Sequence, residues 1–433
     1  MTGAGGVDEA LLKGAGGPKW MVRALRSRNY RLYFGGQGLS LIGTWMQRIA
    51  MSWLVYRLTG STLLLGVVGF ASQIPTFILA PFAGVLADRA DRRKVIIVTQ
   101  TLAMLQALAL AVLVLTGAVA VWQIIFLGIL LGVVNAFDMP ARQSFVVEMV
   151  ENKEDLGNAI ALNSSIVNGA RLIGPSIAGM LVAAFGEGIC FLVNGLSYLA
   201  VILALLAMRI TRREVRPQGP RGWRGMREGF FYAFSFAPIR AVLLLLALAS
   251  LMGMPYTVLM PVFAKDILHG GPSTLGFLMG ATGVGALAGG LYLASRRTVL
   301  GLGRFIPLAT GIFGLGLVAF SFSQLLWLSL LLLLLIGFGL TAQAASSNTV
   351  LQTIIDEDKR GRVMSFYTMA FMGMVPFGSL LAGGLASLIG TPRTVMVGGL
   401  VCLLNALLFI QRISAYLRTE TAPQKVYEIW RGR

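Results

Sequence analysis

The chain has 433 residues, of which 56% are hydrophobic and only 12% charged, and its mean hydropathy is +0.77. A soluble domain carries about 25% charged residues, so the composition excludes an ordinary water-soluble fold and predicts a membrane protein. The formal net charge of +18 would suit a nucleic-acid-binding protein, but the basic residues cluster in loops between apolar stretches, which argues against a nucleic-acid partner.

The first 32 residues are expected to form a cytoplasmic tail that is Gly-rich at first and then basic. The basic part leads directly into a full-length apolar span, unlike the short apolar core of a cleavable signal peptide. We expect this segment to lie on the inner membrane surface, where basic side chains meet anionic lipid headgroups.

Twelve apolar spans follow, and each is long enough for the roughly 20 residues that a helix needs to cross about 30 Å of hydrocarbon. Inside a bilayer only helices and closed barrels satisfy their own backbone polar groups, so spans of this length predict an all-α membrane protein. The expected spans begin near residues 33, 62, 95, 121, 159, 188, 240, 274, 305, 325, 363 and 393.

The longest polar break divides the spans into two groups of six. It holds seven arginines, followed by an aromatic-rich stretch over 226–236 that predicts an amphipathic helix. The expected organisation is a cytoplasmic tail at 1–32, a six-helix bundle at 33–208, a cytoplasmic linker at 209–239, a second six-helix bundle at 240–411 and a cytoplasmic tail at 412–433.

All but five of the 36 Lys and Arg residues fall on one side of this topology. Basic loops face the cytoplasm, so both termini are predicted to be cytoplasmic and the number of spans to be even. The expected location is the plasma (inner) membrane. The five exceptions are Arg48, Arg57, Arg171, Lys265 and Arg393.

A short charged loop after the second span carries the most specific motif. From Gly84 to Lys94 it reads Gly-Val-Leu-Ala-Asp-Arg-Ala-Asp-Arg-Arg-Lys. A glycine, an Asp four residues later and then an Arg cluster resemble the loop between helices two and three of the major facilitator superfamily, although Asp91 stands where that signature usually has Gly. The resemblance implies a solute carrier of twelve helices, in which two pseudo-symmetric bundles rock about a central cavity.

The same resemblance implies a latch that holds the carrier shut on its cytoplasmic side. Gly84 would let helices two and eleven approach, and Asp88 would accept hydrogen bonds from the positive N-terminus of helix eleven. Arg92 would pair with Asp88 and with Asp138 at the cytoplasmic end of helix four. The expected latch residues are Gly84, Asp88, Arg89, Arg92, Arg93 and Asp138.

The two groups of spans look related. Each has an acidic loop followed by a span with a cluster of Gly, Pro and Ser, at residues 148–186 and 352–390. Parallel repeats of this kind are found in alternating-access carriers. Closely spaced glycines concentrate in the second, fifth, eighth and eleventh spans, which predicts that these four helices pack closely where the halves meet.

A second resemblance narrows the family. The stretch from Asn135 to Phe145, followed by Arg171-Leu-Ile-Gly174-Pro175, is similar to the export branch that includes enterobactin exporters and macrolide efflux proteins. The Gly-Pro pair also resembles the helix-five motif of antiporters, and Pro bends a helix by removing a backbone hydrogen bond. The expected gating residues on this helix are Gly169, Gly174, Pro175 and Gly179.

Two arginines lie inside spans, where a charge normally faces protein or water. Arg48 either binds an anionic substrate in the cavity or reaches toward the outer headgroups. Arg171 is expected in a hydrogen-bond network between helices. With neutral polar and aromatic side chains added, the substrate-cavity candidates are Gln37, Thr44, Trp45, Gln47, Arg48, Asn135, Arg171, Gln343 and Asn348.

Proton coupling is implied by the resemblance alone, because no carboxylate stands at the middle of a span and Asp138 is the acidic residue nearest to membrane depth. The sequence offers no catalytic cluster, metal-ligand set or cofactor motif. We therefore expect a monomeric transporter, not an enzyme, that exports a small amphipathic or anionic molecule of drug or siderophore type, with a proton as the coupling ion. The alternatives are a lysophospholipid flippase, a facilitated-diffusion carrier or a non-transporting receptor.

Overall fold

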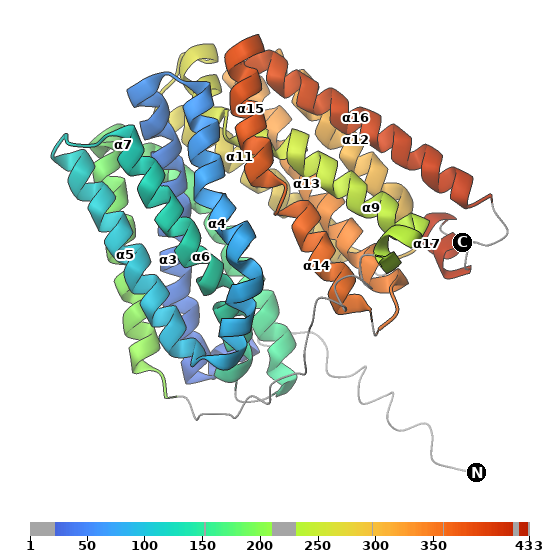
Figure 1. Cartoon of the computed structure of the whole chain (residues 1–433), viewed down its shortest axis with the longest axis horizontal. Helices are drawn as coiled ribbons and strands as arrows, with labels where there is room; N and C mark the ends of the chain where they lie inside the picture. Colours follow the sequence, from blue (N-terminus) through green and yellow to red (C-terminus); the bar gives the residue numbers. More distant parts are fainter. Residues whose placement is uncertain are drawn as a thin grey trace.

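The computed structural model describes residues 22–150, 153–209, 231–296, 298–357, 359–418 and 424–431. In these ranges all regular structure is helical, as the sequence predicts. The helices form two groups that stand side by side, with the first half of the chain in one group and the second half in the other (Figure 1). Residues 231–235 of the expected amphipathic helix over 226–236 are helical, whereas residues 226–230 and most of the expected N-terminal tail lie outside the described residues.

The first group comprises the helices up to α7. Its first crossing begins at Arg28, five residues before the expected start at residue 33. The bounds are η1 (Arg23–Arg26), α3 (Arg28–Thr59), α4 (Thr62–Arg89), α5 (Arg92–Leu115), α6 (Val121–Met149), η2 (Lys153–Asp155) and α7 (Leu156–Ala207).

Helix α7 holds two membrane crossings in one run of 52 residues. At about 1.5 Å per residue, a straight helix of that length would measure about 78 Å, more than twice the thickness of the hydrocarbon. The chain turns back at Gly186, whose φ of 81° favours glycine. Accordingly, both ends of α7 lie beside the start of α3, where Asn158 accepts from the Ala24 N–H and Asn29 bonds to the Arg209 backbone.

In the described part of the chain, ten segments are long and apolar enough to cross a membrane. The turn within α7 divides one of these segments in two, and the more polar α3, which is 32 residues long, adds another crossing. This brings the number to the twelve crossings expected from the sequence.

The second group comprises the helices from α9 onward. The bounds are α9 (Ala237–Leu248), η3 (Ala249–Gly253), η4 (Met254–Thr257), α10 (Met260–Val262), η5 (Phe263–Ile267), α11 (Pro272–Ser295), α12 (Leu302–Ser321), α13 (Leu326–Ile354), α14 (Arg360–Phe371), α15 (Val375–Ile389), α16 (Thr391–Tyr416) and α17 (Gln424–Arg431).

Two crossings of this group are interrupted. The crossing that starts with α9 passes through a π-helical turn, η3, and a 3-10 turn, η4, because Pro255 cannot donate a helical hydrogen bond. The other interruption separates α14 from α15, just before Pro376. The two interruptions touch, since Gly378 of α15 packs against the backbone at Leu251 and against the ring of Pro255.

Helix α17 packs onto the core of the second group. The segment 412–433 that contains it was expected to be a cytoplasmic tail. Its residues Val426, Ile429 and Trp430 are buried in an apolar cluster with α9, α12 and α16. A Cβ atom on Gly303 would lie 2.5 Å from the Trp430 ring, so only glycine fits beneath this side chain.

Candidate functional site

The two groups meet along two pairs of helices, and close glycine contacts form both. One interface joins α4 to α15, and a Cβ atom on Gly66 would lie 2.9 Å from the Cα atom of Gly383. The other joins the first crossing of α7 to α11, and a Cβ atom on Gly179 would lie 2.8 Å from the Cα atom of Gly276. The prediction that the second, fifth, eighth and eleventh crossings meet between the halves is confirmed.

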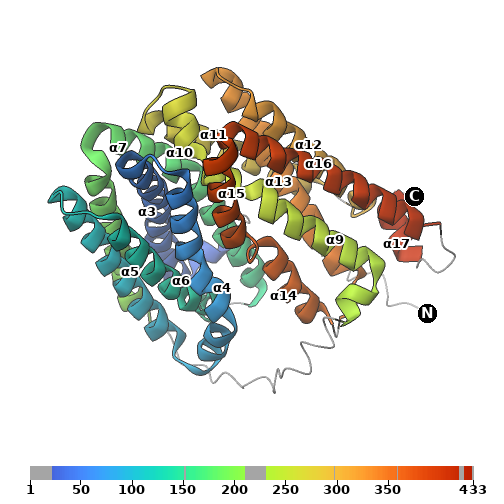
Figure 2. The same cartoon turned by 45° about the horizontal axis from the view of Figure 1, so that its top comes forward.

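Among the described residues, the closest backbone contacts between the halves lie toward one end of the molecule. We call the end that carries the start of α3 and the end of α16 the terminal end, and the opposite end the far end. The glycine contacts lie toward the far end, and Figures 1 and 2 show α4 and α14 diverging toward the terminal end. A Cβ atom on Gly84 would meet nothing within 4 Å, so the close approach expected at this glycine is absent from this conformation.

A polar bridge reinforces the contact at the far end. The Tyr56 hydroxyl, near the end of α3, donates to the Asp266 carboxylate on η5 in the other half. The Lys265 ammonium lies 5.5 Å from the centre of the Tyr56 ring. Beside them, Arg57 Nε donates to Glu187 at 2.7 Å and ties α3 to the second crossing of α7.

Two arginines flank one indole beside the α7–α11 interface. The Arg48 guanidinium lies 4.8 Å from the centre of the Trp45 ring, and that of Arg171 lies 5.8 Å from it. The Trp45 side chain packs directly against Gly174. A Cβ atom added to Gly174 would lie 2.6 Å from the Cβ atom of Trp45. Arg171 is also an electrostatic neighbour of Tyr256 in the other half, so this group of side chains lies where the halves face each other.

Neither arginine has an acidic partner among the residues that the structure describes. Arg171 makes no side-chain hydrogen bond to a described residue either, so the expected network around it is absent from this conformation. Arg48 is exposed and Arg171 half-buried. Two cations beside one aromatic ring, with no acidic partner among the described residues, form a site suited to an anion with an apolar body.

Asp138 lies in a buried polar cluster. Its side chain is only 1% exposed. One carboxylate oxygen accepts hydrogen bonds at 2.8 Å from Thr99 and from Gln100, and the other lies 2.6 Å from Arg142 Nε. Tyr33 faces the same pair from α3. This pair was not predicted from the sequence. The spacing of four residues between Asp138 and Arg142, inside an apolar helix, is the sequence feature that indicates it.

The expected pair between Arg92 and Asp138 is not formed in this conformation. Arg92 Nη1 lies 2.5 Å from Glu148 Oε1, near the end of α6, because Asp138 sits further inside the bundle, where Arg142 of its own helix reaches it first. Arg93 donates to the Leu206 carbonyl at 3.1 Å. The side chains of Asp88 and Arg89 lie outside the described residues.

Asp91 explains the departure from the family signature at this loop. Its carboxylate accepts a hydrogen bond from the Lys94 N–H, which caps the first turn of α5. Asp is among the best residues for this position, where it satisfies a free N–H group and favours the positive end of the helix dipole.

Several cavity candidates point into the bundles instead. Gln47 donates to Gln106 at 2.8 Å and accepts from Asn194 at 2.5 Å, in a chain of amides between α3, α5 and the second crossing of α7. Gln37 and Gln343 are also buried. Both Gln343 amide atoms and the Gln37 Oε1 atom are buried without a hydrogen-bond partner among the described residues.

The remaining candidates are local. Thr44 bonds to the Ser40 carbonyl and lies 3.3 Å from the Tyr198 hydroxyl, while Asn348 accepts from Gln352. Asn135 is half-buried on α6. On the expected gating helix, Gly174 meets α3, Gly179 meets α11 and the Pro175 carbonyl faces Gly276, whereas a Cβ on Gly169 would meet nothing within 4 Å. Among the described residues, no group of three His, Cys, Asp or Glu could hold a metal.

This arrangement defines a class: a multi-pass helical transporter of two bundles, open between them at one end. Residues 22–428 match the family model of transmembrane secretion effectors, and the chain belongs to this family of the major facilitator superfamily. It is a transporter of small molecules, not an enzyme.

Similar proteins cover most of the chain. The staphyloferrin A transporter of Staphylococcus aureus is 26% identical over 387 residues, 88% of this chain and 96% of that protein. The multidrug efflux pump Tap of Mycolicibacterium fortuitum is 27% identical, over 82% of this chain and 88% of its own. Macrolide efflux protein A of Streptococcus pyogenes is 22% identical, over 87% of this chain and 95% of that protein.

Solved structures share the fold. A bacterial homologue of the human lysosomal transporter Spinster superposes with a TM-score of 0.70 at 13% identity, over 94% of this chain and all of that one. A bacterial homologue of the iron transporter ferroportin superposes with a TM-score of 0.66 at 19% identity, over 89% of this chain and 99% of the other.

Proposed function

We propose that the protein exports a small anionic or amphipathic molecule from the cytoplasm across the inner membrane. The observation that carries this proposal is that Arg48 and Arg171 both lie against the Trp45 ring, with no acidic partner for either cation among the described residues. A carboxylate or catecholate would neutralise both guanidinium groups, while the indole would pack against its apolar part. The relatives named for staphyloferrin A, macrolides and multiple drugs support an export function of this breadth.

Transport proceeds by alternating access in this proposal. The basic loops support a cytoplasmic terminal end, and the bundles diverge there while glycine contacts join them at the far end. The described conformation is then the inward-facing one, ready to load substrate from the cytoplasm. A single copy of the chain contains both halves, and so it is taken as the transport unit.

The latch closes the cytoplasmic side in the opposite state. It comprises Gly84, Asp88, Arg89, Arg92 and Arg93 on one half and the start of α14 on the other, with Glu148 in place of Asp138 as the partner of Arg92. The Asp88→Asn variant should shift the carrier toward the inward-facing state. If distances between spin labels at the terminal end are unchanged in that variant, the latch proposal is wrong.

Coupling to protons is assigned to Asp138. It is the buried carboxylate inside a crossing, and its surroundings hold one cation, Arg142, and two phenols, Tyr33 and Tyr198. Protonation would neutralise the partner of Arg142 and leave that cation unpaired within the first half. This change supplies the two states that an antiporter needs.

Reconstitution tests the function. Proteoliposomes with an imposed pH gradient would receive a panel of catecholate siderophores, macrolides, dyes and lysophospholipids. Movement of one class that depends on the gradient would support antiport and identify the substrate class. Movement without any response to the gradient would refute proton antiport and favour facilitated diffusion or lipid flipping.

A further inference from the structure

A surface groove runs along the second half between α9 and α16, and its inner end reaches Leu251 and Met374. Two adjoining cavities of about 430 and 320 Å³ form it, and they share Ala241 and Arg412 in their walls. Figures 1 and 2 show α9 lying between α14 and α16, and residues of α9 and α16 form the two walls of the groove.

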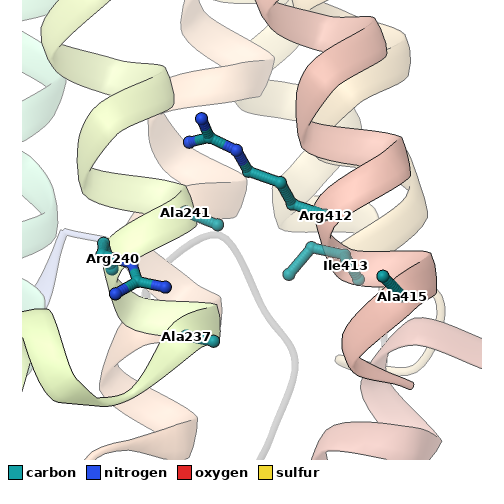
Figure 3. Close-up of a pocket in the computed structure, with 6 residues that line it drawn as sticks. All are labelled: Ala237, Arg240, Ala241, Arg412, Ile413 and Ala415. Atoms are coloured by element: carbon teal, nitrogen blue, oxygen red, sulfur yellow. The ribbon is translucent and has the colours of Figure 1, made fainter. Parts of the chain in front are cut away.

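One end of the groove is cationic. It is lined by Arg240 and Arg412 at the terminal ends of their helices, and both side chains are exposed. Figure 3 shows Arg412 extending from α16 toward α9, with Arg240 below it on α9. Arg240 donates to the Phe234 carbonyl at 3.1 Å, and neither arginine forms an ion pair with a described residue.

The rest of the groove is apolar. Above the arginines its walls are mainly aliphatic and aromatic, from Leu244, Leu248, Leu251, Met374, Leu408 and Phe409. From Arg240 to Leu251 the helix rises by roughly 16 Å at 1.5 Å per residue, which is about half of the hydrocarbon thickness of a bilayer. The groove therefore spans one leaflet, with its charged end at the headgroups.

Aromatic side chains mark the headgroup level independently. Phe236 and Tyr416 stack edge to face beside the charged end, with ring centres 6.2 Å apart. Tyr rings collect at the membrane–water interface, where an apolar body meets a polar edge, and Tyr416 is such a ring. Its position next to the charged end supports placing Arg240 and Arg412 near the depth of the lipid phosphates.

We propose that this groove binds an anionic glycerophospholipid of the leaflet at the terminal end. The phosphate lies between Arg240 and Arg412, and one acyl chain follows the apolar walls toward Leu251. Charge complementarity, the length of one leaflet and the interfacial aromatic pair select this occupant over a neutral lipid or a water-soluble anion. The site is distinct from the Trp45 site, because all of its lining residues belong to the second half and Trp45 lies on α3 of the first half.

Native mass spectrometry of the detergent-purified full chain tests the proposal. The probes are palmitoyl-oleoyl phosphatidylglycerol and palmitoyl-oleoyl phosphatidylcholine, each titrated separately. A basic side chain near an anionic lipid surface contributes roughly fivefold to affinity, so the Arg240→Ala/Arg412→Ala variant should bind phosphatidylglycerol about 25-fold more weakly. Phosphatidylcholine binding should change little.

Two further variants separate the groove from a general charge effect. Arg418→Ala removes a cation at the same end but outside the groove, and it should leave phosphatidylglycerol binding unchanged. Ala247→Phe fills the apolar wall while keeping both arginines, and it should lower phosphatidylglycerol binding too. Equal affinity for the two lipids, an equal loss in Arg418→Ala, or displacement of the bound lipid by a transported substrate would each overturn the proposal.

Discussion

Gly66 and Gly383 bring two helix backbones into direct contact: a Cβ atom on Gly66 would lie 2.9 Å from the Cα atom of Gly383. No side chain fits between α4 and α15 at that point. This contact and its counterpart, Gly179 with Gly276, hold the halves together at the far end. The glycines therefore set which end of the carrier is closed.

Gly383→Val should open the far end. The added side chain would overlap the α4 backbone, and overpacking of this kind costs about 1–3 kcal/mol. We expect the population of the inward-facing state to fall, seen as shorter distances between spin labels placed at the terminal end. The control is Gly384→Val, at a neighbouring position where a Cβ meets nothing within 4 Å. Equal effects of the two variants would contradict a steric role for Gly383.

Arg48→Ala and Arg171→Ala should each weaken binding of anionic substrates. A hydrogen bond to a charged group contributes about 1.5–3 kcal/mol, so the dissociation constant should rise about 10- to 100-fold. Neutral substrates should bind as they do to the parent. Arg393→Ala, which removes a cation at the far end of α16, is the control for net charge. Unchanged binding of anions by both variants would remove the Trp45 site from the substrate path.

Asp138→Asn should destabilise the protein and uncouple it. The change leaves the Arg142 guanidinium without its carboxylate partner in a buried cluster, and breaking such a pair costs about 3–5 kcal/mol. We expect a lower thermal unfolding temperature, with part of the loss recovered in Asp138→Asn/Arg142→Gln.

The transport assay separates stability from coupling. The double variant should still exchange substrate across the membrane but should no longer accumulate it against a gradient when a pH difference is imposed. Gradient-driven accumulation at the parental level would show that another group carries the proton.

Tyr56→Phe should weaken the closed far end. It removes the hydroxyl that donates to Asp266 across the halves while keeping the ring beneath Lys265. A hydrogen bond to a carboxylate is worth about 1.5–3 kcal/mol, so accessibility of a cysteine probe at the far end should rise about tenfold or more. Ser52→Ala, whose hydroxyl bonds only within its own helix to Ile49, serves as the control. Equal accessibility in parent and variant would show that glycine packing alone closes this end.

Helix number and interface helices were predictable because both depend on local composition. Apolar runs of about 20 residues identify crossings wherever they occur, and small residues at regular spacing mark a close helix contact. Thus Gly66, Gly179, Gly276 and Gly383 could be assigned to the interface before any coordinates. The conformation of the carrier could not, since the same glycines fit a closed end on either side.

Side-chain partners were less predictable, as Arg92 and Gln47 illustrate. The motif implied Asp138 as a partner of Arg92. In the structure the partner is Glu148, about three helical turns further along α6. Gln47 was expected in the cavity, and it bonds to Gln106 and Asn194 inside its own bundle. A sequence fixes the spacing of residues along a helix but not the rotation of that helix against its neighbours.

The sequence by itself determined the class of this protein, its crossings, the expected orientation of the chain in the membrane and the glycines of its interfaces. Hydrophobicity, charge and residue size act locally and add along the chain, so each of these features can be predicted segment by segment. Only the tertiary structure decided that Arg48 and Arg171 both lie against Trp45, that Asp138 is buried against Arg142, and that Arg240 and Arg412 line one groove. Each of these groups joins residues from different turns or different helices. Their distances follow from packing, which no single segment encodes.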